Sequence, residues 1–169
     1  MNIWTAVKSC FRQYVGFAGR APRREYWLWV LFCGVVSAVL HGLEGAGGQG
    51  AIGGAWSLAT FLPGLAVAAR RLHDTDRSGW WLLLPALVLA VLGVATGMVM
   101  VEVAAAGGQL NAATVAAMSP RLMALVFSGA AWLVVVGLFL VWFCSRGTAG
   151  PNRFGPDPLA VAATADPGA

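Results

Sequence analysis

Charged residues are scarce in this sequence. Only 11% of its 169 residues are Asp, Glu, Lys or Arg, whereas 59% are hydrophobic and the mean hydropathy is +0.73. Ordinary soluble domains contain roughly 45–50% apolar and about 25% charged residues. The composition therefore excludes an ordinary soluble domain and indicates that a lipid bilayer is the solvent.

Cysteine is also rare, and no metal-binding pattern is present. Cys10, Cys33 and Cys144 are widely spaced, with neither a CxxC pair nor a Cys/His ligand spacing. This excludes a disulfide framework and a zinc site, and we expect neither a metal nor a cofactor. The first long apolar run begins near Tyr26, behind a charged region that is too long for a secretory signal.

Four apolar runs are long enough to cross a membrane, at about residues 26–43, 51–69, 80–101 and 122–144. Pro63 and Pro85 allow kinks in the second and third runs. Between the third and fourth runs we expect a mostly small, uncharged connection that ends at Pro120 and contains a short helix near residues 111–118. The fold class predicted is an all-α integral membrane protein with four transmembrane helices.

An amphipathic helix is predicted ahead of the first span. Residues 1–15 place apolar side chains at helical spacing, with Lys8 and Arg12 between them. The segment is too polar to span, so we expect it to lie in the interface and contact anionic headgroups. Packing on a soluble partner or on the end of the bundle is the alternative. Residues 1–158 are predicted to form one membrane domain, followed by a disordered tail at 159–169.

The distribution of positive charge predicts the orientation. Ten of the eleven Lys and Arg residues lie before the first span, between the second and third, or after the fourth. The first connection has none, and the third has only Arg121. The positive-inside rule then places both termini in the cytoplasm. Topology explains these cations better than nucleic-acid binding, so no nucleic-acid partner is expected. A model with one re-entrant run is the alternative topology.

The densest polar stretch is residues 70–81, RRLHDTDRSGWW, of which five are formally charged. We expect it to be a loop at the membrane surface, with Arg70 and Arg71 ending the second span. Residues 17–27 and 150–158 are further polar segments on the same predicted side. The three segments could therefore meet at one end of a bundle.

These three segments, FAGRAPRREYW, RRLHD with RSGWW, and GPNRFGPDP, resemble the signature blocks of the DUF805 family, the YhaH-like bacterial inner-membrane proteins. The resemblance covers about residues 1–158, and Ala18 and Pro22 stand where polar or basic residues are common in the family. It implies a small multi-pass protein of the bacterial inner, or plasma, membrane. It carries over no activity.

Two interpretations of the polar segments remain open. In one they only fix helix ends, through arginines at helix C-termini and tryptophans at the interface. In the other they bind an anionic group, a lipid phosphate or an acidic partner segment. The candidate residues for that site are Arg20, Arg23, Arg24, Arg70, Arg71, His73, Asp74, Arg77, Asn152 and Arg153. The expected interfacial anchors are Tyr26, Trp27, Trp29, Trp80, Trp81 and Trp142.

Catalysis and transport are the competing function classes. His73 with Asp74 or Asp76 has the residue types of a general acid–base pair or a metal site, but no nucleophile or second histidine cluster accompanies it. Transporters usually carry ionisable residues within their spans, and here these are nearly absent. We therefore predict a non-enzymatic scaffold or lipid- or partner-binding module, with a small transporter or channel subunit as the alternative. Expected partners are membrane lipid, another membrane protein or a second copy of the chain.

Overall fold

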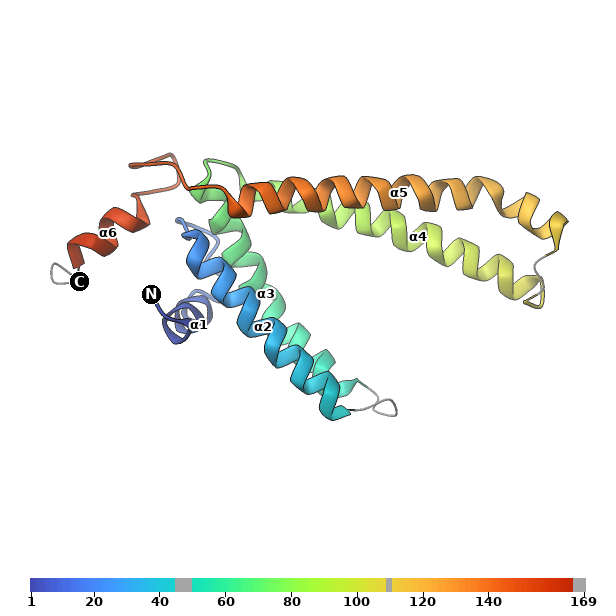
Figure 1. Cartoon of the computed structure of the whole chain (residues 1–169), viewed down its shortest axis with the longest axis horizontal. Helices are drawn as coiled ribbons and strands as arrows, with labels where there is room; N and C mark the ends of the chain where they lie inside the picture. The colour runs from blue at the N-terminus through green and yellow to red at the C-terminus, as the bar shows by residue number, and fades with distance from the viewer. Residues whose placement is uncertain (45–49, 109–110, 166–169) are drawn as a thin grey trace. The chain divides into compact units, whose positions relative to one another are not determined.

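The computed structural model describes residues 1–44, 50–108 and 111–165. These residues form helices, with no β-structure beyond an isolated bridge between Asn152 and Gly155 (Figure 1). Four of the helices are long and apolar enough to cross a membrane, as the sequence predicts. The chain divides into two compact units. Unit 1 comprises Met1–Trp80 and Trp142–Ala169, and unit 2 comprises Trp81–Val141.

Unit 1 is built from an amphipathic helix packed on two spans. Helix α1 (Ile3–Arg12) begins at Asn2, whose side chain accepts the Thr5 backbone N–H at 2.9 Å. The spans are α2 (Arg23–Glu44) and α3 (Ala51–Asp74). A small core is shared by these elements, and it consists of Val7, Cys10, Ala21, Trp29 and Val67. The predicted N-terminal amphipathic helix is confirmed.

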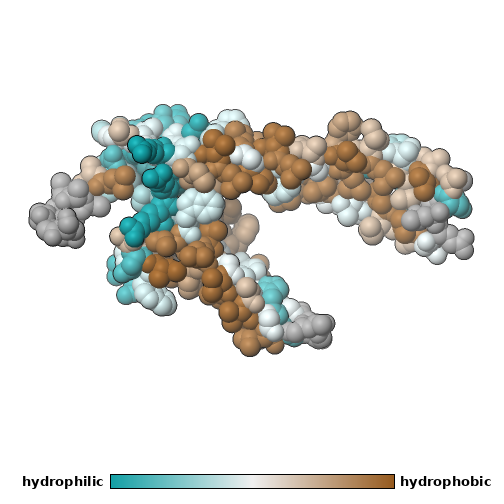
Figure 2. Space-filling view, in the orientation of Figure 1, coloured by the Kyte–Doolittle hydropathy of each residue, from teal (hydrophilic) through white to brown (hydrophobic). Residues whose placement is uncertain are grey.

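The outward surfaces of the spans are hydrophobic. Leu31, Val35 and Val39 of α2 are each more than half exposed, at 56%, 55% and 55%. Hydrophobic side chains also cover the visible surfaces of α4 and α5 (Figure 2). Apolar surface of this extent requires a covering. For helices that cross a membrane, the hydrocarbon of the bilayer provides it.

Helix α3 begins with a cap from a distant carboxylate. Gly50 precedes the helix and has no side chain that could accept its first N–H groups. Instead Glu44, at the end of α2, accepts the N–H groups of Ile52 at 2.7 Å and Gly53 at 3.1 Å. Its negative charge also complements the positive end of the α3 dipole. The end of α2 is therefore tied to the start of α3.

Helix α3 continues beyond its predicted end. Arg70 and Arg71 do not stop it, because buried acidic partners neutralise both side chains and allow the helix to run to Asp74. It ends in a Schellman motif, with Arg77 N–H bonded to Leu72 O and Asp76 N–H bonded to His73 O. Asp76 has φ 56°, the left-handed conformation that this motif requires. The predicted loop at residues 70–81 is thus largely helical.

Pro63 lies inside α3 and cannot donate a hydrogen bond to the carbonyl of Ala59. The Tyr14 hydroxyl, which follows α1 in the chain, donates to that carbonyl at 2.7 Å. A side chain from outside the helix therefore satisfies the acceptor that the proline leaves open. This bond also connects the end of α1 to the middle of α3.

Unit 2 is mainly a helical hairpin. After the short 3-10 helix η1 (Gly79–Leu82), α4 (Leu83–Ala105) pairs with α5 (Ala112–Cys144). Pro85 lies in the first turn of α4, where backbone N–H groups have no acceptor within the helix, so the N–H that proline lacks removes no helical hydrogen bond. The predicted break at Pro120, between a short helix near residues 111–118 and the fourth span, is wrong. Ser119 donates its hydroxyl to Ala116 O at 2.8 Å, the carbonyl that Pro120 cannot serve, and α5 continues through the proline.

The segment predicted to be a disordered tail contains a short helix in this structure. Residues Pro158–Ala165 form the short helix α6, with proline at its first position and alanines after it. Asp157 accepts the Leu159 N–H at 2.9 Å and so caps the helix. Hydrogen bonds from Leu159 and Gly150 lower the pKa of this carboxyl. Residues 166–169 lie outside the described part of the chain.

The bond between Tyr14 and Ala59 predicts that Tyr14 and Pro63 are energetically coupled. Tyr14→Phe should lower the free energy of unfolding by about 1–2 kcal/mol, because it leaves a carbonyl without a donor. In a Pro63→Ala background the new backbone N–H can serve Ala59, so the same substitution should cost much less. Unfolding of all four proteins in one detergent measures this coupling. Equal costs in the two backgrounds would contradict it.

Candidate functional site

Asp74, at the C-terminal end of α3, lies at the centre of a buried charge cluster. Arg20 donates Nε to its Oδ1 at 3.0 Å, and Arg71 donates Nη1 to its Oδ2. The three side chains are at most 5% exposed. Each carboxylate oxygen thus has its own guanidinium partner, as a buried carboxylate requires.

The two arginines also bind carbonyl groups near the end of α5. Arg71 donates to the carbonyls of Trp142, Phe143 and Ser145. Arg20 donates to the carbonyls of Thr148 at 2.6 Å and Gly150 at 2.7 Å. The last carbonyls of a helix have no partners within it and carry partial negative charge. They therefore balance the positive charge that one aspartate leaves on two arginines.

The segment after α5 packs closely around the end of α3. Thr148 donates its N–H to Asp74 O at 2.8 Å, and Asn152 donates Nδ2 to His73 O at 2.9 Å. A Cβ added at Gly147 would lie 2.6 Å from Asp74 Cγ, so only glycine fits at this position. Residues from all three predicted polar segments therefore meet in unit 1.

A second buried ion pair joins α2 to α3. Arg70 donates Nη1 to Glu25 Oε1 at 3.1 Å, and Ser9 of α1 donates its hydroxyl to the same oxygen at 2.9 Å. We call Arg20, Glu25, Arg70, Arg71 and Asp74 the arginine clamp. Arg70 Nε and Nη2 have no hydrogen-bond partner among the described residues.

Cys10 of α1 lies beside this second pair, with its sulfur 4.0 Å from Glu25 Oε1. Burial, and to a lesser degree the negative charge of Glu25, raise the pKa of the Cys10 thiol to about 12. The thiol is therefore protonated at neutral pH and behaves as a small apolar core residue.

Both ring nitrogens of His73 are occupied. Nδ1 lies 3.1 Å from Gly19 O, and Nε2 lies 3.3 Å from the Gly79 N. A carbonyl can only accept and an N–H can only donate, so the ring is neutral with its proton on Nδ1. Phe154 stacks on the ring at 3.9 Å. His73 thus joins three segments of the chain and has no lone pair left for a proton transfer or a metal.

The remaining candidate cations lie outside the clamp. Arg23 and Arg24, at the start of α2, are exposed and take part in none of the ion pairs among the described residues. Arg77 donates to Thr75 O and lies 4.7 Å from the Trp142 ring centre. Arg153 forms an exposed pair with Asp76 at 3.2 Å. The structure therefore separates the predicted site residues into buried and exposed groups.

The predicted aromatic anchors differ in their exposure, and one of them is buried. Trp29 is buried in the core at 3% exposure and packs edge-on against Phe11, so it is not a surface anchor in this structure. Tyr26 packs on Phe143 at 4.4 Å. Trp80 and Trp81 are exposed, at 78% and 46%, and Trp27 and Trp142 are half-buried. A tryptophan near a helix start looks the same in sequence whether it faces lipid or a neighbouring helix.

Several contributors to the cluster are hard to find in sequence. Ser9 and Thr148 are common polar residues, and their role depends on contacts far along the chain. Among the residues that the structure describes, no group of three or more His, Cys, Asp or Glu could hold a metal ion.

The clamp predicts a large difference between two aspartates only two positions apart. Asp74→Asn should lower the free energy of unfolding by about 3–5 kcal/mol, because it leaves two buried guanidinium groups without their carboxylate. Asp76→Asn is the matched control, and it should cost about 0–1 kcal/mol because its ion pair with Arg153 is exposed. Asparagine also accepts the left-handed conformation at this position. Denaturant unfolding in detergent compares the two, and similar losses would contradict the structure.

Comparison with known proteins identifies the family of this chain. The model of a family described as "Protein of unknown function (DUF805)" matches residues 14–156, a range that includes the whole clamp. No solved structure matches the chain significantly.

Two relatives from Escherichia coli (strain K12) are similar over most of their length. Inner membrane protein YhaH is 35% identical over 153 residues, which cover 87% of this chain and 90% of that protein. Inner membrane protein YhaI is 36% identical over 152 residues, covering 89% and 92%. With the family match, the four membrane-spanning helices and the three polar segments joined at the clamp, these similarities show that the chain is an integral inner-membrane protein of the DUF805 family.

Proposed function

We propose that this protein is a non-enzymatic membrane module that binds anionic lipid headgroups through the exposed face of α1. The observation that carries the proposal is the composition of that face. Trp4 and Phe11 are 65% and 39% exposed, and Lys8 and Arg12 lie exposed beside them. These four residues and Val7 line a shallow groove.

Large aromatic side chains beside cations suit the boundary between headgroups and acyl chains. Indole and phenyl rings enter the upper hydrocarbon, while ammonium and guanidinium groups meet phosphates. Neither Lys8 nor Arg12 takes part in the ion pairs among the described residues. Each cation close to an anionic membrane surface contributes ~1 kcal/mol of attraction.

The buried side of α1 supports a fixed presentation of this face. Ala6, Val7 and Cys10 are buried, Ser9 is bonded to Glu25, and Tyr14 is bonded to α3. A helix held in this way loses little conformational freedom when it binds lipid. The exposed Arg23 and Arg24 add positive charge at the start of α2.

The clamp is assigned a structural role in this proposal. The donors of Arg20 and Arg71 point to Asp74 and to backbone carbonyls, so a lipid phosphate would have to break those bonds first. The use of both His73 nitrogens within the protein supports a module without catalytic activity. Of the predicted site residues, the exposed Arg23 and Arg24 are then the ones that can join Lys8 and Arg12 in binding lipid.

We place both termini, the α3–α4 connection and the exposed α1 face at the cytoplasmic surface. The support is the positive-inside distribution, with ten of eleven cations on that side. The inner leaflet also carries the anionic lipid that this face would bind.

Anionic-lipid selectivity tests the proposal. The full-length protein is reconstituted in phosphatidylcholine, and its association with spin-labelled phosphatidylglycerol is compared with that of spin-labelled phosphatidylcholine. Lys8→Gln with Arg12→Gln should weaken the preference for phosphatidylglycerol by up to about 2 kcal/mol, and high salt should weaken it in the native protein.

The matched control keeps the charge but exchanges the side chains. Lys8→Arg with Arg12→Lys should preserve the preference, and both double variants should unfold at similar denaturant concentrations. An unchanged preference in the glutamine variant would refute the assignment to α1.

Orientation is tested separately with reporter fusions. A fluorescent protein that folds only in the cytoplasm should be active after Thr75 and after Ala165. A phosphatase that is active only outside should report after Gly50 and after Gly108. Any other alternation would exclude the proposed topology.

A further inference from the structure

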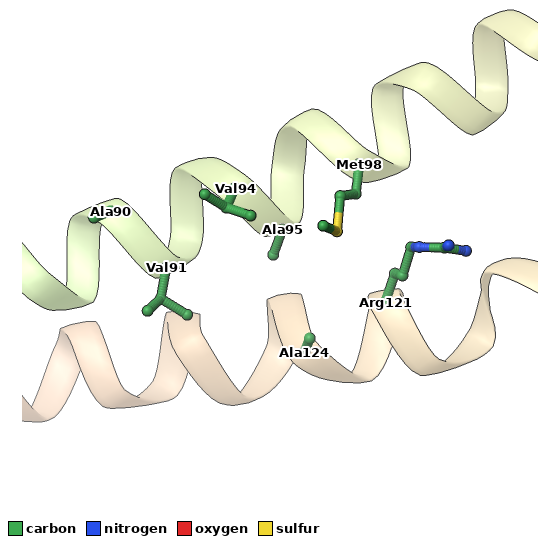
Figure 3. Close-up of a pocket in the computed structure, with 7 residues that line it drawn as sticks. All are labelled: Ala90, Val91, Val94, Ala95, Met98, Arg121 and Ala124. Atoms are coloured by element: carbon green, nitrogen blue, oxygen red, sulfur yellow. The ribbon is translucent and has the colours of Figure 1, made fainter.

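A groove of about 390 Å³ runs between α4 and α5 of unit 2. Figure 3 shows its lining, with Ala90 and Val91 toward one end and Met98 and Arg121 toward the other. Apart from Arg121, the lining side chains are aliphatic or Met, and those of Ala90, Ala95 and Ala124 are small. The groove belongs to membrane-spanning helices, so it is open to the hydrocarbon of the bilayer.

The charged end of this groove holds an unusual pair. Arg121 and Glu102 are the only charged residues in the sequence from 81 to 141, and Arg121 Nη1 donates to Glu102 Oε1. The second carboxylate oxygen, Oε2, is enclosed and has no hydrogen-bond partner among the described residues. The carboxylate is therefore short of donors, while the Arg121 side chain is 43% exposed and able to turn.

We propose that this groove binds one acyl chain of a phosphoethanolamine lipid, with the headgroup at Arg121 and Glu102. The guanidinium of Arg121 turns to the lipid phosphate, and the lipid ammonium takes its place on Glu102. One ion pair within the protein and one within the zwitterion become two pairs between protein and lipid. No charge is left unpaired, and the ammonium supplies the donors that the carboxylate lacks.

Charge complementarity selects this headgroup over the other common types. A purely anionic headgroup would satisfy Arg121 but leave Glu102 without a cation, and an unpaired carboxylate with an enclosed oxygen is costly. A phosphocholine headgroup carries a positive charge but no N–H, so it cannot donate to the carboxylate. A primary ammonium beside a phosphate matches both side chains.

The dimensions also fit the part of an acyl chain that is nearest the headgroup. The lining of α4 from Ala90 to Met98 extends over about 12 Å at 1.5 Å per residue. Glu102 lies one turn beyond Met98, near the end of α4 at Ala105, where a headgroup would be expected. The proposal is independent of α1 and its anionic lipids, because it concerns different residues and a different headgroup.

Lipid retention by the full-length protein tests the proposal. The protein is purified in detergent with equal amounts of phosphatidylethanolamine, phosphatidylcholine and phosphatidylglycerol of identical chains, and bound lipid is measured by native mass spectrometry. Phosphatidylethanolamine should be retained about tenfold over phosphatidylcholine, the ratio expected for hydrogen bonds to a charged group. Equal retention of the three lipids, or a preference for phosphatidylglycerol, would overturn the proposal.

Variants locate the site. Glu102→Gln should remove the preference for phosphatidylethanolamine over phosphatidylcholine, and Ala124→Phe should abolish retention by filling the groove. Ala130→Phe, an exposed position outside the groove, is the matched control and should leave retention unchanged. Selective retention that survives both Glu102→Gln and Ala124→Phe would place the lipid elsewhere. A dimer that Ala124→Phe dissociates, with no lipid retained, would show that a second copy occupies the groove.

Discussion

The ion pairs from Asp74 to Arg20 and Arg71 are the interaction on which unit 1 depends. They bring together a residue that precedes the first span, the end of the second span and the chain that leaves the fourth. Burying three charges is costly, and the structure offsets the cost with one guanidinium for each carboxylate oxygen and with carbonyls that α5 leaves unpaired. Removing one member would expose the others to an apolar surrounding with no replacement partner.

This arrangement explains how several arginines lie close together at the end of α3 without forming an open charged surface. Arg70 and Arg71 remain helical because Glu25 and Asp74 neutralise them, and His73 uses both its nitrogens to hold Gly19 and Gly79. The cations of α1 and of the start of α2 are instead exposed and take part in none of the ion pairs among the described residues. Buried and exposed cations therefore differ in their partners, although they are neighbours in sequence: the buried ones bind groups within the protein, and the exposed ones face its surroundings.

Hydropathy was sufficient to predict the four spans, and helical periodicity was sufficient to predict α1. The polar segments were correctly expected to meet, but the role of each residue depended on long-range partners. Nothing local distinguishes the buried Arg20 from the exposed Arg23, since only the approach of Asp74 decides between them. Pro120 failed as a helix stop because the adjacent Ser119 provides the missing donor. Likewise, Trp29 has the position of an interfacial anchor but packs in the core.

The backbone acceptors of Arg20 and Arg71 have a consequence for the order in which the molecule is made. The two arginines and Asp74 are synthesised early, whereas the carbonyls at 142–150 are among the last parts of the membrane domain to leave the ribosome. A chain interrupted after its third span leaves these guanidinium groups without their final acceptors. The cluster is complete only once the chain as far as Gly150 has been made, so the packing of unit 1 has to wait for the segment that follows the fourth span.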